Sequence, residues 1–346
     1  MLREAGLLRL YQPRRFGGLE MPYGRMQVDI ASVLGAVSAS LAWVQSGLSV
    51  HGWIVGNFPR EAQEAVWGGK PDALVATGFT DTGGRAREVD GGLLLDGTWH
   101  FSSACSVSDW VIVRVSVAAQ GQPPRLTLCL VPRGDLAIED VWDPVGLRGT
   151  GSNNVVLREC FVPRERTIEL LSLRGGAAPP DPEASFLYRL PFMSLFPFAV
   201  AVPALGVARG ALDAYRRDVT ASPEKSSQVT RQIRFAEAAA RIDCAALLLK
   251  STGQEIEDAL AARRVLGTHD KIGGKRNYAF AVRLCRDAVG ALVQDLGARG
   301  IENSHPVQRA WRDVLAISSH FGVNWDVSGE YFGREAFGLP PTDPMA

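Results

Sequence analysis

The stretch WRDVLAISSHFGVN, residues 311–324, places one histidine, His320, near the end of a segment that reads as a helix. Its tryptophan, valine, leucine and isoleucine recur at helical intervals, which predicts a buried face. An imidazole with its ordinary pKa near 6.5 can accept a proton from a phenol or an amine at neutral pH. A lone histidine at a helix end is also commonly a cap or a satisfied core side chain, and the pattern alone favours that interpretation.

Other catalytic signatures are missing from the sequence. The remaining histidines, at positions 51, 100, 269 and 305, lack the close spacing of metal ligands, so we predict no metal site. The chain has no GxSxG, HExxH, GxxxxGK[ST] or CxxC motif. GLRGTGSNN, residues 146–154, is rich in glycine, but it leaves a strand-rich region and opens no βαβ unit, so it indicates a loop and not a dinucleotide site.

Composition describes an ordinary soluble protein. The 346 residues are 46% hydrophobic, which is enough for two or three packed units. Lys plus Arg and Asp plus Glu both total 37, so no net charge attracts nucleic acid, and a small molecule or another protein is the expected partner. Five scattered cysteines without a CxxC pair predict free thiols in a reducing cytoplasm, and the N-terminal stretch lacks a secretory signal.

One segment has nearly the length that spans a bilayer. Residues 190–208, LPFMSLFPFAVAVPALGVA, contain no charge over 19 positions. Prolines at 191, 197 and 203 favour a buried helix of a large soluble protein, or one that lines an apolar pocket. We therefore predict no membrane partner.

The elements that would position these residues fall into three parts, with domains expected at 1–70, 71–172 and 185–346. Residues 23–56 carry helical periodicity, whereas 72–167 contain short β-branched runs, and the DG pairs at 90 and 96 predict hairpins of an antiparallel sheet. A Gly/Pro-rich linker at 173–185 precedes helices predicted at 198–219, 227–264, 275–298 and 305–320. The fold class is α+β, with a helical start, a middle β-domain and a C-terminal helical bundle.

Four stretches, in this order, resemble the acyl-CoA dehydrogenase superfamily. They are AGLLRLYQPRRFGGLE, LLLDGTWHFSSACSVSDWVIV, VGLRGTGSNNVVLRECFVPRERT and LGARGIENSHPVQRAWRDV. The resemblance covers nearly the full chain and implies that superfamily's helix, sheet and four-helix-bundle architecture. The superfamily usually has a further helical stretch before the first of these segments, which here begins almost at residue 1.

Two departures separate this chain from the dehydrogenases. No carboxylate lies between Asp313 and Asp326, and His320 stands within one residue of the position expected for the dehydrogenases' glutamate base. TGFTDTGGRA replaces their TE-P-x-x-GSD motif. Both departures resemble the oxygenase components of two-component flavin-dependent monooxygenases, such as 4-hydroxyphenylacetate hydroxylases, whose W-x-F-x-S-G motif is close to Trp99, Phe101 and Ser103.

This resemblance implies a cofactor and a set of site residues. The cofactor is reduced FMN or FAD, bound non-covalently, which reacts with molecular oxygen to give a C4a-hydroperoxyflavin. His320 is implied as the base, Ser103 as the hydroxyl near flavin N5, Phe101 and Ser102 as members of the flavin strand, and His51 as a second pocket histidine. Apolar walls that exclude water are expected from Phe192, Phe196 and Phe198, and Arg148, Thr150 and Ser152 are further pocket candidates.

The resemblance also implies partners. Arg231, Gln232 and Gly297 correspond to positions that reach a flavin held mainly by a neighbouring subunit, so a homotetramer is expected. A separate NAD(P)H-dependent flavin reductase is implied, because the chain has no nicotinamide fingerprint. Three alternatives remain open: an acyl-CoA dehydrogenase-like oxidoreductase whose base has moved, an amino-sugar N-oxygenase of the same fold, and a non-catalytic scaffold or ligand-binding relative.

Overall fold

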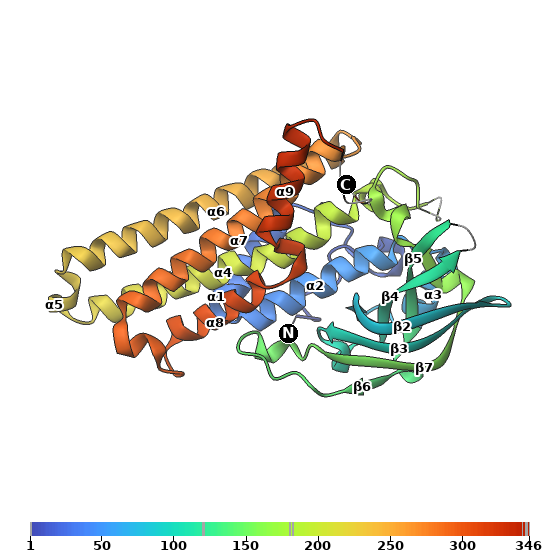
Figure 1. Ribbon diagram of the computed structural model, residues 1–346, viewed down its shortest axis with the longest axis horizontal. Helices are drawn as coiled ribbons and strands as arrows, with labels where there is room; N and C mark the ends of the chain where they lie inside the picture. The colour runs from blue at the N-terminus through green and yellow to red at the C-terminus, as the bar shows by residue number, and fades with distance from the viewer. Residues whose placement is uncertain are drawn as a thin grey trace.

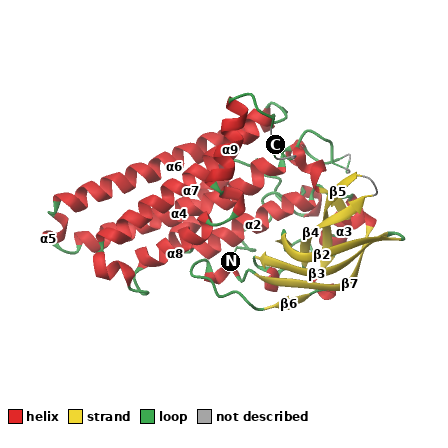
Figure 2. Cartoon of the chain, viewed as in Figure 1, coloured by secondary structure: helices red, strands yellow, loops and turns green. Residues whose placement is uncertain are grey.

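The computed structural model describes residues 2–119, 122–179, 181, 183–340, 342 and 345. Long helices lie side by side at one end of the molecule, and the strands gather at the other end (Figure 1). Colouring by secondary structure separates the same two regions (Figure 2). This is the helix, sheet and helix order that the sequence predicts, and the α+β class is confirmed.

The helical start consists of α1 (Arg25–Val37), α2 (Ala39–Val55) and α3 (Arg60–Trp67). Ser38 ends α1 and begins α2, because its side chain accepts a hydrogen bond from Leu41 N–H. A Cβ on Gly35 of α1 would lie only 2.9 Å from the carbonyl oxygen of Pro203, so this glycine allows α1 to cross the bundle at close range. Gly35 of the helical start therefore serves close packing.

The middle region is an eight-stranded sheet in the order β6-β7-β3-β2-β4-β5-β8, with β1 beside β4. The strands are β1 (Val75–Gly78), β2 (Thr80–Val89), β3 (Gly92–Ser102), β4 (Trp110–Ala119), β5 (Gln122–Pro132), β6 (Ala137–Glu139), β7 (Asn153–Pro163) and β8 (Thr167–Glu169). Most pairs are antiparallel, as predicted, but β1 and β2 each run parallel to β4.

The two DG pairs have different roles. Gly91 has a φ of 77° in the turn between β2 and β3, so the hairpin predicted there is confirmed. The hairpin predicted at Asp96–Gly97 is wrong, because β3 continues through both residues. The register against β7 shifts between Leu95 and Gly97, and Gly97 has a φ of 143°, so this glycine permits a β-bulge in place of a turn.

The C-terminal part contains α4 (Phe192–Thr220), α5 (Pro223–Ser226), α6 (Val229–Ala261), α7 (Thr268–Asp295), α8 (Pro306–Ser318) and α9 (Trp325–Ala336). The four predicted helices correspond to α4, α6, α7 and α8, whereas α9 was not predicted. The stretch 311–324 is not one helix. It stops at Ser318, and His320 is extended, with φ −73° and ψ 135°, before the short 3-10 helix η9 (Phe321–Val323).

Two large hydrophobic cores, with a small third cluster of Leu8, Leu48, Leu74 and Ala104, hold the described part of the chain together. The first joins the helical start to the bundle, and the second lies within the sheet. Helix α4 is apolar enough to cross a membrane, but 83% of its most apolar window is buried inside the protein, where it packs against α1, α2, α7 and α8. All five cysteines are free thiols, as predicted.

Candidate active site

A cavity of about 570 Å³ lies where the sheet meets the helices. Its walls come from α2, from β1 to β3, from the segment 140–152 between β6 and β7, from α4, and from the end of α8 with η9. The volume is in the range typical of small-molecule and cofactor sites. His320, His51, Ser103 and Phe101 all line this cavity, so four of the predicted site residues are brought together from distant parts of the chain.

Aromatic rings form much of the wall. Phe196 lies 5.4 Å from Phe79 and 5.9 Å from the His320 ring, between ring centroids. Phe192 stacks behind Phe196, whereas Phe198 packs into the core against Tyr278, so only one of the three predicted phenylalanines lines the cavity. Of the described residues that line the cavity, none is a lysine, an arginine, an aspartate or a glutamate. The site therefore presents no carboxylate base of the dehydrogenase kind.

His320 is held as a hydrogen-bond acceptor on one side of its ring. Gly322 N–H donates to His320 Nδ1 over 3.0 Å, so the neutral ring carries its proton on Nε2. The ring stacks on Phe321 and meets the edge of Trp43, with centroids 5.5 Å apart in the second contact. Burial lowers the pKa of His320 to about 4, so the side chain is neutral at pH 7.

His51 has the opposite arrangement. Its Nδ1 lies 2.8 Å from the carbonyl oxygen of Val75, which can only accept, so the proton is on Nδ1. Nε2 lies 3.1 Å from Thr77 Oγ1 and accepts the hydroxyl proton. Burial lowers the pKa of His51 to about 4, although the bond to Val75 opposes this shift. Within the cavity, His51 and His320 are thus both neutral, and His51 has a basic Nε2 whereas His320 has an Nε2–H donor.

These lowered pKa values predict acid sensitivity. A histidine in the unfolded chain has a pKa near 6.5, so between about pH 6.5 and pH 4 the unfolded state binds a proton that buried His51 does not. The free energy of unfolding should therefore fall as the pH is lowered from about 6.5 toward 4, by up to about 1.4 kcal/mol per pH unit for this group. Urea denaturation at pH 7 and pH 5 measures this difference. It should be smaller in His51→Gln, and an equal difference in both proteins would contradict the prediction.

A chain of hydroxyl groups runs along one side of the cavity. Trp43 Nε1–H donates to Ser103 Oγ over 3.0 Å, and Ser103 Oγ lies 2.7 Å from Ser152 Oγ. Ser152 in turn lies 2.7 Å from Thr150 Oγ1, which donates to the carbonyl oxygen of Leu147 over 2.9 Å. Ser103 is therefore fixed by neighbours on α2 and in the segment 140–152, and is not a free edge hydroxyl.

The two other flavin-strand candidates lie differently. Phe101 is 63% exposed, has a φ of 59°, and meets Trp142 edge-on at the cavity wall. Ser102 is fully buried and is not among the residues that line the cavity, so it contributes to the packing of the strand. Ala104 stands at the glycine position of the W-x-F-x-S-G motif that this stretch resembles, and it adopts a φ of 59° just after the strand.

Segment 140–152 is fastened to the middle of α8. Leu147 N–H donates to Asp313 Oδ1 over 2.7 Å, and Arg312 donates to the carbonyl oxygen of Val145 over 2.9 Å. Burial raises the pKa of Asp313, although its bond from Leu147 opposes the shift. Arg312 and Asp313 thus hold the loop wall of the cavity in place.

Arg231, Gln232 and Gly297 lie apart from the cavity. They sit near the α5 end of the bundle, whereas the strands lie at the other end (Figure 1). The Arg231 guanidinium pairs with Asp295 at 3.0 Å, and Gln232 donates to the carbonyl oxygen of Ser226 over 2.9 Å. Gly297 has a φ of 60° and begins the 3-10 helix η8 (Gly297–Ile301). The fold does not bring these three residues to the cavity of their own chain.

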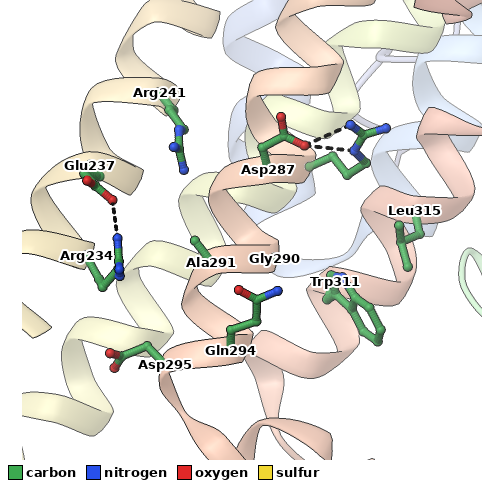
Figure 3. A pocket seen from close by; sticks show the side chains of 11 residues that line it. Arg234, Glu237, Arg241, Asp287, Gly290, Ala291, Gln294, Asp295, Trp311 and Leu315 are labelled. Atoms are coloured by element: carbon green, nitrogen blue, oxygen red, sulfur yellow. Dashed lines mark hydrogen bonds and ion pairs between the residues drawn. The ribbon is translucent and has the colours of Figure 1, made fainter. Parts of the chain in front are cut away.

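A second depression, of about 660 Å³, lies between α6, α7 and α8 (Figure 3). Arg234 pairs with Glu237 at 2.9 Å on α6, and Arg286 pairs with Asp287 at 2.9 Å on α7. These paired charges, with Gln294, make the groove polar, and Trp311 supplies one wall. It lacks the apolar enclosure of the first cavity, so we place the chemistry in the first.

Several cavity residues have no simple signal in the sequence. Thr77 and Trp43 were not predicted, because nothing in the sequence shows that β1 lies beside α2. His100 also lines the cavity, where Asn154 Oδ1 lies 2.8 Å from its Nδ1. Because successive side chains of a strand point to opposite faces of the sheet, the pattern of β1 could have indicated on which face Thr77 lies. It could not have indicated that His51 is its partner.

The residues present fit a flavin ring. Its flat apolar faces match the aromatic walls, and its polar edge matches the fixed Ser103 hydroxyl, whose oxygen keeps a free lone pair. Residues 198–325 match the family model described as acyl-CoA dehydrogenase, C-terminal domain. Fold and site together therefore define a flavin enzyme built on the acyl-CoA dehydrogenase architecture.

Similar proteins narrow this class. The oxygenase component of an FADH2-dependent resorcinol hydroxylase from Rhizobium sp. strain MTP-10005 is 35% identical, over 98% of this chain and 87% of the relative. The crystal structure of 3-HSA hydroxylase from Rhodococcus sp. RHA1 aligns with a TM-score of 0.94 at 30% identity, covering 100% of this chain and 90% of that one. XiaF from Streptomyces sp., solved with FADH2 and glycerol, aligns with a TM-score of 0.88 at 27% identity. The alignment covers 99% of this chain and 88% of XiaF.

The chain belongs to the family of oxygenase components of two-component flavin-dependent monooxygenases. It is an oxidoreductase that uses reduced flavin and molecular oxygen on a small-molecule substrate. As an oxygenase component, it works with a separate reductase. The resemblance seen in the four sequence stretches is thereby confirmed.

Proposed function

We propose that this enzyme hydroxylates a small phenolic substrate, with His51 as the proton acceptor and His320 as a hydrogen-bond donor. The observation that carries the proposal is the opposite polarity of neutral His51 and neutral His320 in one aromatic cavity, whose described lining contains no lysine, arginine, aspartate or glutamate. A phenol has an apolar ring and a single O–H group, and it needs to lose that proton to become a strong carbon nucleophile. One relative is named as a hydroxylase of resorcinol, which is a phenol.

The proton route runs through Thr77. A phenol hydroxyl that binds at Thr77 Oγ1 gives its proton to that oxygen while the Thr77 hydroxyl proton passes to His51 Nε2. His51 then carries a positive charge, and its Nδ1–H remains bonded to Val75 O. The hydroxyl group of Thr77 is regenerated, so the net transfer is one proton from the substrate to the imidazole.

His320 supports the reaction from another wall. Its Nε2–H can donate to an oxygen atom in the cavity, whereas its only lone pair is already used by Gly322 N–H. The sequence-based prediction that His320 is the base stays the alternative, and it requires the bond from Gly322 to break. A sugar substrate fits less well, since its hydroxyls would face Phe79, Phe196 and Phe321.

Reduced flavin supplies the electrons that activate dioxygen when it is bound. Ser103 would face flavin N5, Phe101 would cover the cavity mouth, and the aromatic walls would exclude water from the reacting atoms. We propose FAD as the flavin, supported by the FADH2 named for two of the relatives. The reductase would be NAD(P)H-dependent.

Assembly and location complete the proposal. Arg231, Gln232 and Gly297 lie far along the bundle from the cavity, so they would reach a flavin only in another subunit. Exposed Val229, Ile233 and Leu247 on α6 supply apolar surface for such a contact. We therefore propose a homotetramer formed through the bundle, located in the cytoplasm, where five free thiols stay reduced.

The test is an assay of the purified chain with a flavin reductase, NADH and FAD. Simple phenols should give product one oxygen atom heavier, measured by mass spectrometry, with oxygen consumed in equal amount. Without a phenol, oxygen should be converted to hydrogen peroxide. Anaerobic reduction of the bound flavin by an acyl thioester would instead support a dehydrogenase, and a chain that binds neither form of flavin would support a non-catalytic relative.

A further inference from the structure

The hydroxyl chain beside the cavity has a fixed direction. At one end, the Leu147 carbonyl oxygen can only accept, so the single proton of the Thr150 hydroxyl points at it over 2.9 Å. Thr150 Oγ1 must then accept from Ser152 over their 2.7 Å contact. Each hydroxyl has one proton, so the direction of this first bond fixes the next one along the chain.

The direction continues to Ser103. Since the Ser152 proton points at Thr150, the 2.7 Å contact between Ser152 and Ser103 uses the Ser103 proton. The other end of the chain is also fixed, because the indole N–H of Trp43 can only donate and does so to Ser103 Oγ. Ser103 therefore meets any molecule in the cavity with a lone pair and without a free proton.

This polarity distinguishes the two redox states of a flavin. Reduced flavin carries an N–H group at N5, whereas oxidised flavin has a lone pair at the same atom. We infer that Thr150 and Ser152 are positioning residues that make the site prefer reduced flavin, because they hold Ser103 as an acceptor for N5–H. The inference rests on the proposed function, in which Ser103 faces N5, and it deepens it by assigning the choice of redox state.

The size of the preference follows from the cost of reversing the chain. If all three hydroxyl protons turned round, Ser103 could donate to oxidised N5, but the Leu147 oxygen would lose its bond from the Thr150 hydroxyl. That oxygen would keep the indole N–H of Trp142 at 3.0 Å and the Thr150 backbone N–H at 3.1 Å. The reversal thus costs about one hydrogen bond, which corresponds to roughly a tenfold difference in affinity.

Thr150→Val tests the direction of the chain. Valine keeps the shape of threonine but neither donates to Leu147 nor accepts from Ser152, so the chain can run either way. We expect the ratio of the dissociation constants for oxidised and reduced FAD to fall roughly tenfold, measured by anaerobic titration of protein fluorescence. Thr150→Ser is the matched control, because it keeps the hydroxyl, and its ratio should equal that of the unaltered protein.

A second variant and a second probe exclude a simple loosening of the site. Ser152→Ala removes the acceptor of the Ser103 proton, so oxidised FAD should again gain affinity relative to reduced FAD. With 5-deaza-FAD, which has carbon in place of N5, the ratio should be the same in all four proteins. An unchanged FAD ratio in both Thr150→Val and Ser152→Ala, or equal affinity of the unaltered protein for both forms, overturns the inference. Failure of the unaltered protein to bind either form would instead contradict the proposed function.

Discussion

His51→Gln should lower the rate of hydroxylation roughly a hundredfold to ten-thousandfold, the range expected for the loss of a general base. Glutamine can still accept the hydrogen bond from Thr77 through its amide oxygen, but it cannot take up a proton. Binding of reduced flavin should change little, because the hydrogen bonds of His51 go to Val75 and to Thr77, which is proposed to bind the substrate and not the flavin. The measurement is product formation under single-turnover conditions with reduced flavin already bound.

The pH dependence separates His51 from His320. As the pH approaches the pKa of a phenol, near 10, the substrate enters already deprotonated, so the rate of His51→Gln should recover. His320→Ala should also lose hydroxylation while keeping flavin binding, but high pH should not restore it, because the missing group is a donor. Recovery of His320→Ala at high pH without recovery of His51→Gln would return the role of base to His320.

Gly146→Ala should have the largest effect on the structure of the cavity wall. A Cβ at this position would overlap the backbone carbonyl of Arg312 and lie 2.8 Å from Asp313 N. No side-chain rotation can relieve a clash with backbone, so the segment 140–152 would have to move away from the middle of α8. We expect a loss of roughly 3 kcal/mol in the free energy of unfolding, together with weaker binding of flavin.

The control for this change is Gly134→Ala. Gly134 lies in the 3-10 turn Arg133–Asp135, and a Cβ there would have no neighbour within 4 Å. Its urea denaturation midpoint should stay within experimental error of that of the unaltered protein. If Gly146→Ala behaved in the same way, the close seat of the loop on α8 would not be required for the fold.

Sequence pattern predicted the large elements well because their signals are local. Helical periodicity indicated α4, α6, α7 and α8, and β-branched runs indicated the long strands. The pattern was less reliable where one local signal has two structural uses. Asp96–Gly97 has the composition of a turn, but β3 continues through it and pairs with the neighbouring strand β7. The pair therefore forms a bulge within the strand.

The candidate site was predictable only in part, because it depends on contacts between distant segments. His320 lines the cavity, as expected from its place near the position of the dehydrogenases' glutamate, but its tautomer depends on Gly322 N–H after the helix has ended. The role of Thr77 depends on the parallel pairing of β1 with β4, which places its hydroxyl beside His51. Neither relation has a counterpart in residue types or spacing.

The loop wall suggests how related enzymes could acquire new substrates. Segment 140–152 supplies Trp142, Val145 and Leu147 to the cavity, yet it is fastened to α8 mainly through backbone atoms and the carboxylate of Asp313. The side chains of Val145 and Leu147 can therefore be exchanged by mutation while their backbone bonds to α8 are preserved. Gly146, Thr150 and Ser152 of the same segment are constrained by close packing and by the hydroxyl chain. Evolution, or a protein engineer, could change which substrate the cavity accepts through these two side chains without moving the segment away from α8.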